Sequence, residues 1–264
     1  MKILICTDLE GVSGVVSFEE QAYATGRYYE QAKRLLTAEV NAAIEGLLEE
    51  GVEETLVVDG HGPGAICFEE LHPAARLFHG RPWAWRVFCD EVIKTFDATV
   101  MIGQHAMAGV ERGTLNHTQS SKSIDYYKLN GRLIGEIAQW ALKAGHFGVP
   151  LIFLSGDDAA CREAEELVPG MATAAVKTGM SRTSAISLAP AEARRRIREG
   201  IKQAVRRHRE HPLAPVAWPG PFVLEKKFFH SGSVDGYAGH PMAKILDPQR
   251  VQLRSENIMD IIYA

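Results

Sequence analysis

Two carboxylates, Asp8 and Glu10, stand two positions apart near the start of the sequence. They directly follow residues 2–7, an apolar run with the length and composition of a buried strand. In extended geometry, residues two apart point to the same side of the chain, so both carboxylates can address one ion. Unpartnered carboxylates would be very costly in an apolar core, whereas two hard oxygen donors suit a divalent metal. The alternative is a pair of solvated loop acids.

Two histidines also follow short apolar runs. His61 comes after residues 55–58 and stands among glycines, which let the backbone approach a ligand closely. His105 comes after residues 98–102. Taken singly, His61 is better explained as a loop histidine and His105 as a histidine packed under a loop. Together with the two carboxylates they form a mixed oxygen and imidazole donor set, which zinc and similar borderline ions prefer.

A fifth candidate ligand, Glu136, is expected in the first turns of a helix over residues 133–144. Five ligands are one more than a tetrahedral zinc site uses. Two metals bridged by one carboxylate would use them all and leave positions for water and substrate. His117, in the polar loop 113–118, keeps three interpretations: a sixth ligand, an exposed loop residue, or a general acid or base.

The elements that must position these residues alternate between strand and helix. Short apolar runs predict strands over 2–7, 55–58, 98–102 and 150–154, and residues 123–129 with the Asn130-Gly131 turn predict a hairpin. Helical spacing predicts helices over 28–50 (ended by Gly51), 133–144 (with Ile134, Ile137, Ala138 and Ala141 inward) and 189–208. This alternation indicates an α/β fold with a mostly parallel sheet flanked by helices. In such a fold, ligands bind outside the carboxyl ends of the strands.

The length of 264 residues suits one large domain or one domain with an appended lobe. We therefore expect a single α/β domain over residues 1–264. Residues 212–221 contain four prolines and a glycine and predict a connector. Residues 212–264 are then a candidate small lobe or C-terminal extension. Within it, residues 231–236 have the flexible composition of a loop, which could reach a neighbouring subunit's site.

Composition excludes several classes of protein and partner. The chain has 29 basic and 33 acidic residues, a net charge of −4, and 46% hydrophobic residues, which excludes intrinsic disorder and fibrous proteins. The arginine-rich stretch 189–208 is expected to be a solvated helix face and not a nucleic-acid site, because the acidic net charge supplies no field that attracts phosphates. Its core stripe is formed by Ile197, Ile201, Ala204 and Val205.

Targeting signals and cysteine spacing also limit the possible cellular location and the state of the thiols. The apolar runs are far shorter than the roughly 20 residues that cross a bilayer, so no membrane association is expected. The N-terminus lacks the features of a signal peptide, which favours a cytoplasmic protein. The four cysteines lack CxxC spacing, so reduced thiols are expected rather than disulfides or a thiolate zinc site.

Five short motifs contain the candidate residues. They are Thr7-Asp8-Leu9-Glu10-Gly11, Asp59-Gly60-His61-Gly62, Gly103-Gln104-His105-Ala106, Asn116-His117-Thr118 and Gly135-Glu136. In this order they resemble the motifs of the zinc-dependent D-aminopeptidases of the DppA type, peptidase family M55. The resemblance covers about the first 140 residues, and the remainder fits only loosely. One departure is Gly60, where the family has a serine before the histidine, which removes a hydrogen bond but no ligand.

The resemblance implies a dinuclear site with two Zn²⁺ per subunit, Asp8 as the bridging ligand and His117 as the catalytic residue. The other ligands would be Glu10, His61, His105 and Glu136. It also implies action on short peptides with an N-terminal D-residue, such as D-alanyl-D-alanine, and assembly into a ring-like homo-oligomer such as a decamer. By metal chemistry, the two ions would activate a bridging water that attacks the scissile carbonyl. His117 would then protonate the leaving amine or stabilise the oxyanion.

Two other functions compete with this interpretation. Residues 8–11 resemble the DxDG motif of haloacid dehalogenase-like magnesium phosphatases, and residues 155–158 resemble their late acidic motif. In that case Asp8 would be a nucleophile, but the second acid is Glu10 and the histidines would have no role. Asp157 and Asp158 are more simply expected to cap the next helix. The second competitor is a non-catalytic metal- or peptide-binding protein that retains the fold.

Overall fold

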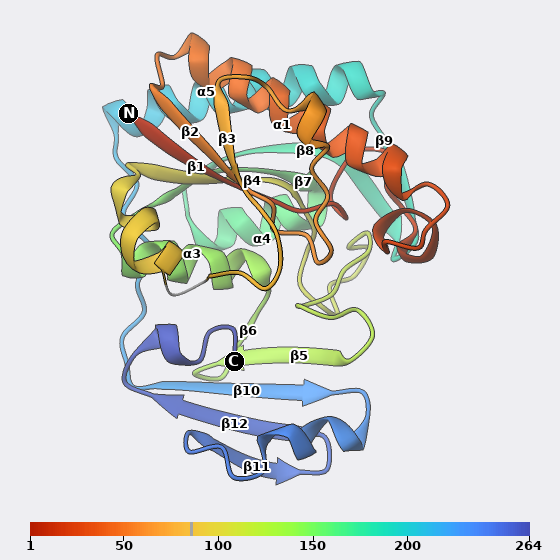
Figure 1. Cartoon of the computed structure of the whole chain (residues 1–264), viewed down its shortest axis with the longest axis vertical. Helices are drawn as coiled ribbons and strands as arrows, with labels where there is room; N and C mark the ends of the chain where they lie inside the picture. The colour runs from red at the N-terminus through yellow and green to blue at the C-terminus, as the bar shows by residue number, and fades with distance from the viewer. Residues whose placement is uncertain (85–86) are drawn as a thin grey trace.

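Two sheets of different kinds form the frame of the chain in the computed structural model, which describes residues 1–84 and 87–264 (Figure 1). The first sheet has seven strands in the order β3-β2-β1-β4-β7-β8-β9 and is parallel except for β9, which runs antiparallel to β8. The strands are β1 (Lys2–Thr7), β2 (Glu54–Val58), β3 (Ala75–Phe78), β4 (Ala98–Gln104), β7 (Leu151–Asp157), β8 (Ala172–Ser181) and β9 (Ser184–Ser187). The predicted α/β class with a mostly parallel sheet is confirmed.

Helices cover both faces of this sheet. They are α1 (Tyr29–Glu49), α3 (Glu136–His146), α4 (Asp158–Leu167) and α5 (Pro190–Glu210). Ile3 and Ile5 of β1 pack into one core with α1 and α5, whereas Leu4 points to the other face, towards α3 and α4. This alternation is the two-residue period of a strand that is buried on both sides. Shorter turns lie at Phe18–Ala22 (η1), Phe68–Glu70 (η2), Phe88–Val92 (η3), Ile93–Thr95 (η4), Ser231–Tyr237 (η5) and Ile258–Asp260 (η6).

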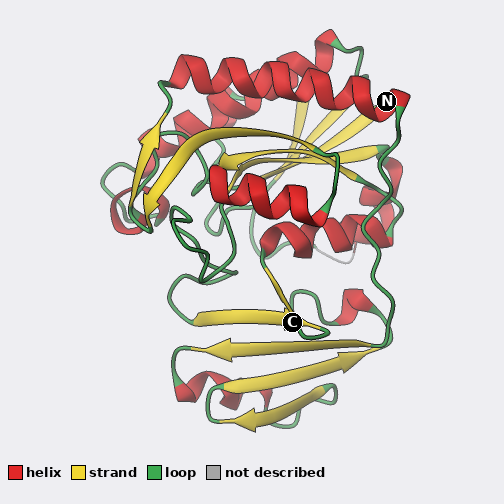
Figure 2. Cartoon of the chain, turned by 180° about the vertical axis from the view of Figure 1, so that it is seen from behind, coloured by secondary structure: helices red, strands yellow, loops and turns green. Residues whose placement is uncertain are grey.

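The second sheet is antiparallel and lies on the side of α3 that faces away from the first sheet (Figures 1 and 2). Its order is β11-β12-β10-β5-β6. The strands are β5 (Ile124–Leu129), β6 (Arg132–Ile134), β10 (Phe222–Phe228), β11 (Ala243–Asp247) and β12 (Arg250–Ser255). Trp140 of α3 packs into the core of the first sheet, and Leu142 packs against the second. Helix α3 therefore joins the two layers.

Most predicted elements are present within a few residues of their expected bounds. Helix α5 begins with Pro190 in its first turn, and its predicted core stripe is buried. Its basic face forms ion pairs with α1, including one between Arg198 and Glu45, as expected of a solvated face. The predicted hairpin joins β5 to β6, and Asn130 and Gly131 both have the positive φ that its tight turn requires.

Three local expectations are wrong. The helix predicted from residue 133 begins only at Glu136, because residues 133 and 134 pair with β5 as part of β6, and Ile134 packs against the second sheet. Strand β7 continues past residue 154 to Asp157, since it pairs with β8 along this length. Residues 231–236 are not a flexible loop but lie in η5, where Val234 is buried in the core of the second sheet. The contact of this segment with a neighbouring subunit stays a prediction.

The second sheet takes strands from both sides of residue 212, because β5 and β6 precede it and β10–β12 follow it. The division into one domain with a lobe over residues 212–264 stays a prediction. Within the described ranges, no helix has the length and hydropathy needed to cross a membrane. The same residues contain no disulfide, in agreement with the expected reduced thiols.

Candidate metal centre

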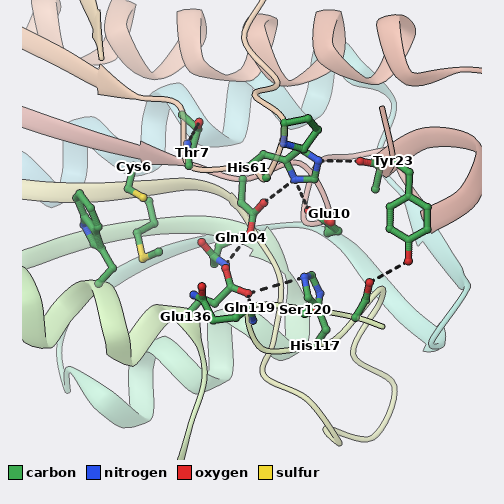
Figure 3. A pocket seen from close by; sticks show the side chains of 18 of the residues that line it. Cys6, Thr7, Glu10, Tyr23, His61, Gln104, His117, Gln119, Ser120 and Glu136 are labelled. Carbon is green, nitrogen blue, oxygen red and sulfur yellow. Dashed lines mark hydrogen bonds and ion pairs between the residues drawn. The ribbon is translucent and has the colours of Figure 1, made fainter. Parts of the chain in front are cut away.

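The predicted ligands meet at the carboxyl end of three adjacent strands. Asp8 and Glu10 follow β1, His61 follows β2, and His105 follows β4. Since β2, β1 and β4 are parallel neighbours, their ends share one edge of the sheet. Glu136 reaches this edge as the first residue of α3, and His117 reaches it from the connection between β4 and β5 (Figure 3).

Asp8 lies at the centre of the group, and its two oxygens face different histidines. Oδ1 is 3.2 Å from Nδ1 of His61, and Oδ2 is 3.1 Å from Nε2 of His105. The carboxylate is held by hydrogen bonds from the main-chain N–H of Leu9 to Oδ1 (2.8 Å) and from the Gln104 amide to Oδ2 (3.1 Å). A carboxylate in this position can bridge two cations.

The remaining acids complete two neighbouring clusters. Glu10 Oε2 lies 3.1 Å from His61 Nδ1. Glu136 Oε1 lies 3.5 Å from His105 Nε2 and 3.8 Å from His117 Nε2. The donor atoms of Asp8, Glu10 and His105 all fall within 4.8 Å of one another, as do those of His105, His117 and Glu136. The structure thus brings all six predicted residues together, while their individual roles stay predictions.

The candidate ligands are deeply buried, and their polar atoms are arranged as a site for divalent cations would require. Asp8, Glu10, His61 and His105 are buried, and ionised carboxylates at such depth need a compensating positive charge. Among the described residues, Glu10 Oε2 and His105 Nε2 lie close to His61 and Asp8 but make no well-aligned hydrogen bond. In both His61 and His105, the ring nitrogen that faces away from the carboxylates is hydrogen-bonded to a main-chain carbonyl oxygen. His61 Nε2 is 2.7 Å from Ala22 O, and His105 Nδ1 is 2.9 Å from Ala106 O. This arrangement directs the second nitrogen of each imidazole at the carboxylates, as in metal sites.

The pKa shifts of the acids and histidines in this cluster also indicate a cation site. Burial alone would raise the pKa of Asp8, but its bonds and charge interactions with His105 and His61 hold that pKa well below its usual value. Burial would lower the pKa values of both histidines, but the carboxylates, Glu10 for His61 and Glu136 for His105, raise them well above normal. Without a metal, protonated imidazoles therefore balance the acids. A bound cation would replace these protons, because a metal ligand must be a neutral imidazole.

His117 differs from the other two histidines. Burial and the neighbouring charge of His105 lower its pKa, so its ring is neutral near pH 7. Its Nδ1 is 2.9 Å from Leu115 O, which leaves Nε2 facing Glu136. The ring stacks on His105 with centroids 4.0 Å apart. His117 is thus held with an unprotonated nitrogen beside the cluster.

Asp157 holds the connection that carries His117. Its Oδ1 accepts from Ala160 N (2.9 Å) and caps α4, as expected from the sequence. Its Oδ2 accepts from Thr114 N (2.7 Å), three residues before His117. A second tie comes from Gln119 N, which donates to Glu136 Oε1 (2.7 Å). The sequence predicted the cap but not its second bond.

A cavity of about 640 Å³ opens over the cluster. Besides five of the six predicted residues, its wall contains Gln104, Cys6, Met101, Trp140 and Tyr263, which the sequence analysis did not single out. Gln104 was next to a predicted ligand in its motif. The sequence contained a signal for two of the others, because residues two apart on a strand or four apart on a helix share a face. Cys6 is two residues before Asp8 on a strand, and Trp140 is four residues after Glu136 on a helix.

Comparison with known proteins agrees with this site. The family model of peptidase M55, D-aminopeptidase, matches residues 1–264. The chain belongs to peptidase family M55. A D-aminopeptidase of Bacillus subtilis (strain 168) is 33% identical to this M55 member over 239 residues, which are 89% of this chain and 84% of the relative. Family membership confirms the resemblance found in the five motifs. It also excludes the alternative of a haloacid dehalogenase-like phosphatase.

A solved structure extends the agreement to the fold of this M55 protein. The structure is described as Zn-dependent D-aminopeptidase DppA from Bacillus subtilis, a self-compartmentalizing protease. It superimposes with a TM-score of 0.91 at 29% identity, covering 99% of this chain and 94% of the other. The likeness therefore includes the second sheet and the residues after 221, where the motif resemblance was loose.

Proposed function

We propose that this M55 protein is a zinc-dependent aminopeptidase that hydrolyses short peptides with an N-terminal D-residue, such as D-alanyl-D-alanine. The observation that carries the proposal is the position of Asp8, one oxygen of which faces His61 while the other faces His105. The likeness to a relative described as a Zn-dependent D-aminopeptidase supports the metal and the substrate class.

The donor set fits two zinc ions per subunit. Glu10 and His61, with Oδ1 of Asp8, would hold one ion, and His105 and Glu136, with Oδ2 of Asp8, would hold the other. When bound, zinc ions lower the pKa of a water and polarise a carbonyl. Gln104, through its hydrogen bond to Oδ2, would keep the Asp8 carboxylate turned so that each oxygen serves one side.

His117 is proposed as the group that moves the proton. Since its Nδ1–H donates to Leu115 O, its neutral ring can only accept at Nε2. It would therefore first take a proton from the attacking water and afterwards give it to the leaving amine. The lowered pKa of His117 keeps this nitrogen unprotonated near neutrality, which is the state a general base needs.

We further propose that the protein is cytoplasmic and forms a ring-like homo-oligomer such as a decamer. The self-compartmentalizing description of the structural relative supports assembly. Light scattering coupled to size-exclusion chromatography measures the mass directly against the 29.1 kDa chain. A monomer at micromolar concentration would contradict the assembly without affecting the proposed chemistry.

Hydrolysis of matched D-alanyl and L-alanyl dipeptides tests the proposed function. The protein is assayed as purified, after chelation, and after restoration of zinc, with metal content measured at each step. We expect alanine release from the D-peptide, loss of that activity on chelation, recovery with zinc, and two zinc ions per subunit. Bound zinc without cleavage of either peptide would instead favour a non-catalytic metal- or peptide-binding protein.

A further inference from the structure

The cavity over the metal centre has two chemically different ends. Beyond the ligands, one end is lined by Cys6, Met101, Trp140 and Tyr263, which we call the apolar end. The opposite side is lined by Tyr23, Ser121 and Lys122, and the Lys122 side chain is exposed. In Figure 3 Cys6 and Tyr23 lie on opposite sides of the labelled metal-binding residues. A substrate at the metals would therefore extend in two unequal directions.

Residues of the apolar end lie on the same faces of β1 and α3 as the candidate ligands. Cys6 precedes Asp8 by two residues on β1 and so shares its face. Cys6 also pairs in register with Met101 of the neighbouring strand β4. Trp140 follows Glu136 by four residues on α3, one helical turn away. Apolar side chains thus stand next to both Asp8 and Glu136.

The apolar end is closed by the protein core. Met101 and Trp140 are 1% and 2% exposed, and both belong to the core between the first sheet and helices α3 and α4. The Trp140 indole is fixed by a hydrogen bond from Nε1 to Thr99 Oγ1 (2.9 Å). The segment that carries Tyr263 is fixed by a bond from Gln139 Nε2 to Ile262 O (2.7 Å). No chain could pass through this wall, so a bound peptide can only end there.

We propose that the apolar end receives the side chain of the N-terminal residue of the substrate, and that Met101 and Trp140 restrict it to apolar side chains of moderate size. This inference rests on the proposed aminopeptidase function. An aminopeptidase needs a closed end on the N-terminal side of the scissile bond, and the apolar end is closed. A charged side chain would lose its hydration among the side chains of the apolar end, whereas an apolar side chain would gain contacts there.

Two dipeptide panels test the inference with the zinc-loaded enzyme. One panel varies the N-terminal residue (Ala, Leu, Phe, Asp, Lys) before a constant alanine, and the other varies the C-terminal residue after a constant N-terminal alanine. The stereochemistry is the one that the wild type cleaves. Discrimination by one methylene in an apolar pocket is about tenfold or more. We expect at least that preference in kcat/KM for apolar over charged N-terminal residues, and a much weaker one in the second panel.

Substitutions in the wall give the second arm of the test. Met101→Ala should shift kcat/KM about tenfold towards Leu and Phe relative to Ala at the N-terminal position, and Cys6→Ala should shift it less in the same direction. The matched control is Met171→Ala, because Met171 is buried in the same core but does not line the cavity. This control should leave the preferences unchanged. Zinc content and thermal unfolding identify any variant that fails to fold.

The outcomes separate the inference from the function on which it rests. Cleavage without preference at the N-terminal residue, or an equal shift of both panels in Met101→Ala, would overturn the inference alone. A shift confined to the C-terminal panel would assign the apolar end to the other side of the scissile bond. No cleavage of any peptide by the zinc-loaded wild type would overturn the proposed function and the inference together.

Discussion

The ammonium group of Lys177 lies 2.5 Å from the main-chain carbonyl oxygen of Glu10, to which it donates a hydrogen bond. Lys177 belongs to β8 and is fully buried, and it donates two further bonds to the carbonyls of Val12 (3.1 Å) and Val15 (2.5 Å). Burial lowers its pKa to about 8. One side chain therefore holds the whole turn after β1 that presents Glu10 to the metal centre.

Replacing this lysine should loosen that turn. We expect Lys177→Met to lower the free energy of unfolding by about 2–4 kcal/mol, because three buried carbonyls lose their donor. Zinc binding should weaken as well, since Glu10 loses its fixed position. Urea denaturation and metal analysis measure both effects. Lys244→Met, at an exposed position on β11, is the control and should change stability by less than about 0.5 kcal/mol. Wild-type zinc content in Lys177→Met would contradict the role of Lys177.

Asp8 and His117 should respond differently to truncation. Asp8→Ala removes the carboxylate that faces both histidines, so we expect loss of zinc together with loss of activity. His117→Ala should lower kcat by roughly 10²–10⁴-fold, the usual contribution of a general acid or base, while zinc content is retained. Metal analysis and dipeptide kinetics on the same preparations distinguish the two. An equal loss of zinc in both variants would make His117 a ligand, a position that its distance from Glu136 also permits.

The backbone of Thr7 leaves no room for a side chain at Gly60, the residue before His61. A Cβ at this position would lie 2.3 Å from the main-chain oxygen of Thr7, which precedes Asp8. Gly60→Ala should therefore push the turns after β1 and β2 apart, lowering stability by about 1–3 kcal/mol and weakening zinc binding. The control is Gly62→Ala, where a Cβ meets nothing within 4 Å. Thermal unfolding and zinc titration should find Gly62→Ala close to wild type, and equal behaviour of the two variants would disprove the steric explanation.

Glu39 should make the folded protein less stable as the pH rises. Burial raises its pKa from 4.5 to about 7, although the Ser13 N–H and the charge of Lys177 act in the opposite direction. The folded state then binds more protons than the unfolded state between these two values, so this contribution to stability is present below pH 4.5 and is lost as the pH rises through 7.

A glutamine at this position tests the sign of that effect. Glu39→Gln cannot ionise but keeps an oxygen for the Ser13 N–H, which lies 3.0 Å from Oε1. Relative to wild type, the variant should gain roughly 3 kcal/mol of unfolding free energy between pH 4.5 and 8. Urea denaturation of both proteins across this range, with zinc kept saturating, measures the difference. Parallel stability curves would show that Glu39 does not titrate in this window.

Local sequence determined the ligands and most of the elements that carry them. The types and positions of Asp8, Glu10, His61 and His105 followed from polar residues placed directly after apolar runs, because strand ends are local features with a two-residue period. The hairpin at Asn130 and Gly131 was equally local, since two residues with positive φ suffice to make its turn. The five ordered motifs were specific enough to indicate the family.

Only the tertiary structure decided what surrounds those ligands. Lys177 reaches Glu10 from 167 residues away, and Tyr263 brings the end of the chain into the cavity. Helix α3 begins at Glu136 rather than at residue 133 because the preceding residues pair with β5, whose other neighbour, β10, comes from the far end of the chain. Periodicity reports which side of an element is apolar, but it carries no information about which distant segment covers that side. Long-range packing therefore determined the second sheet, the anchor of the metal loop and the closed end of the cavity.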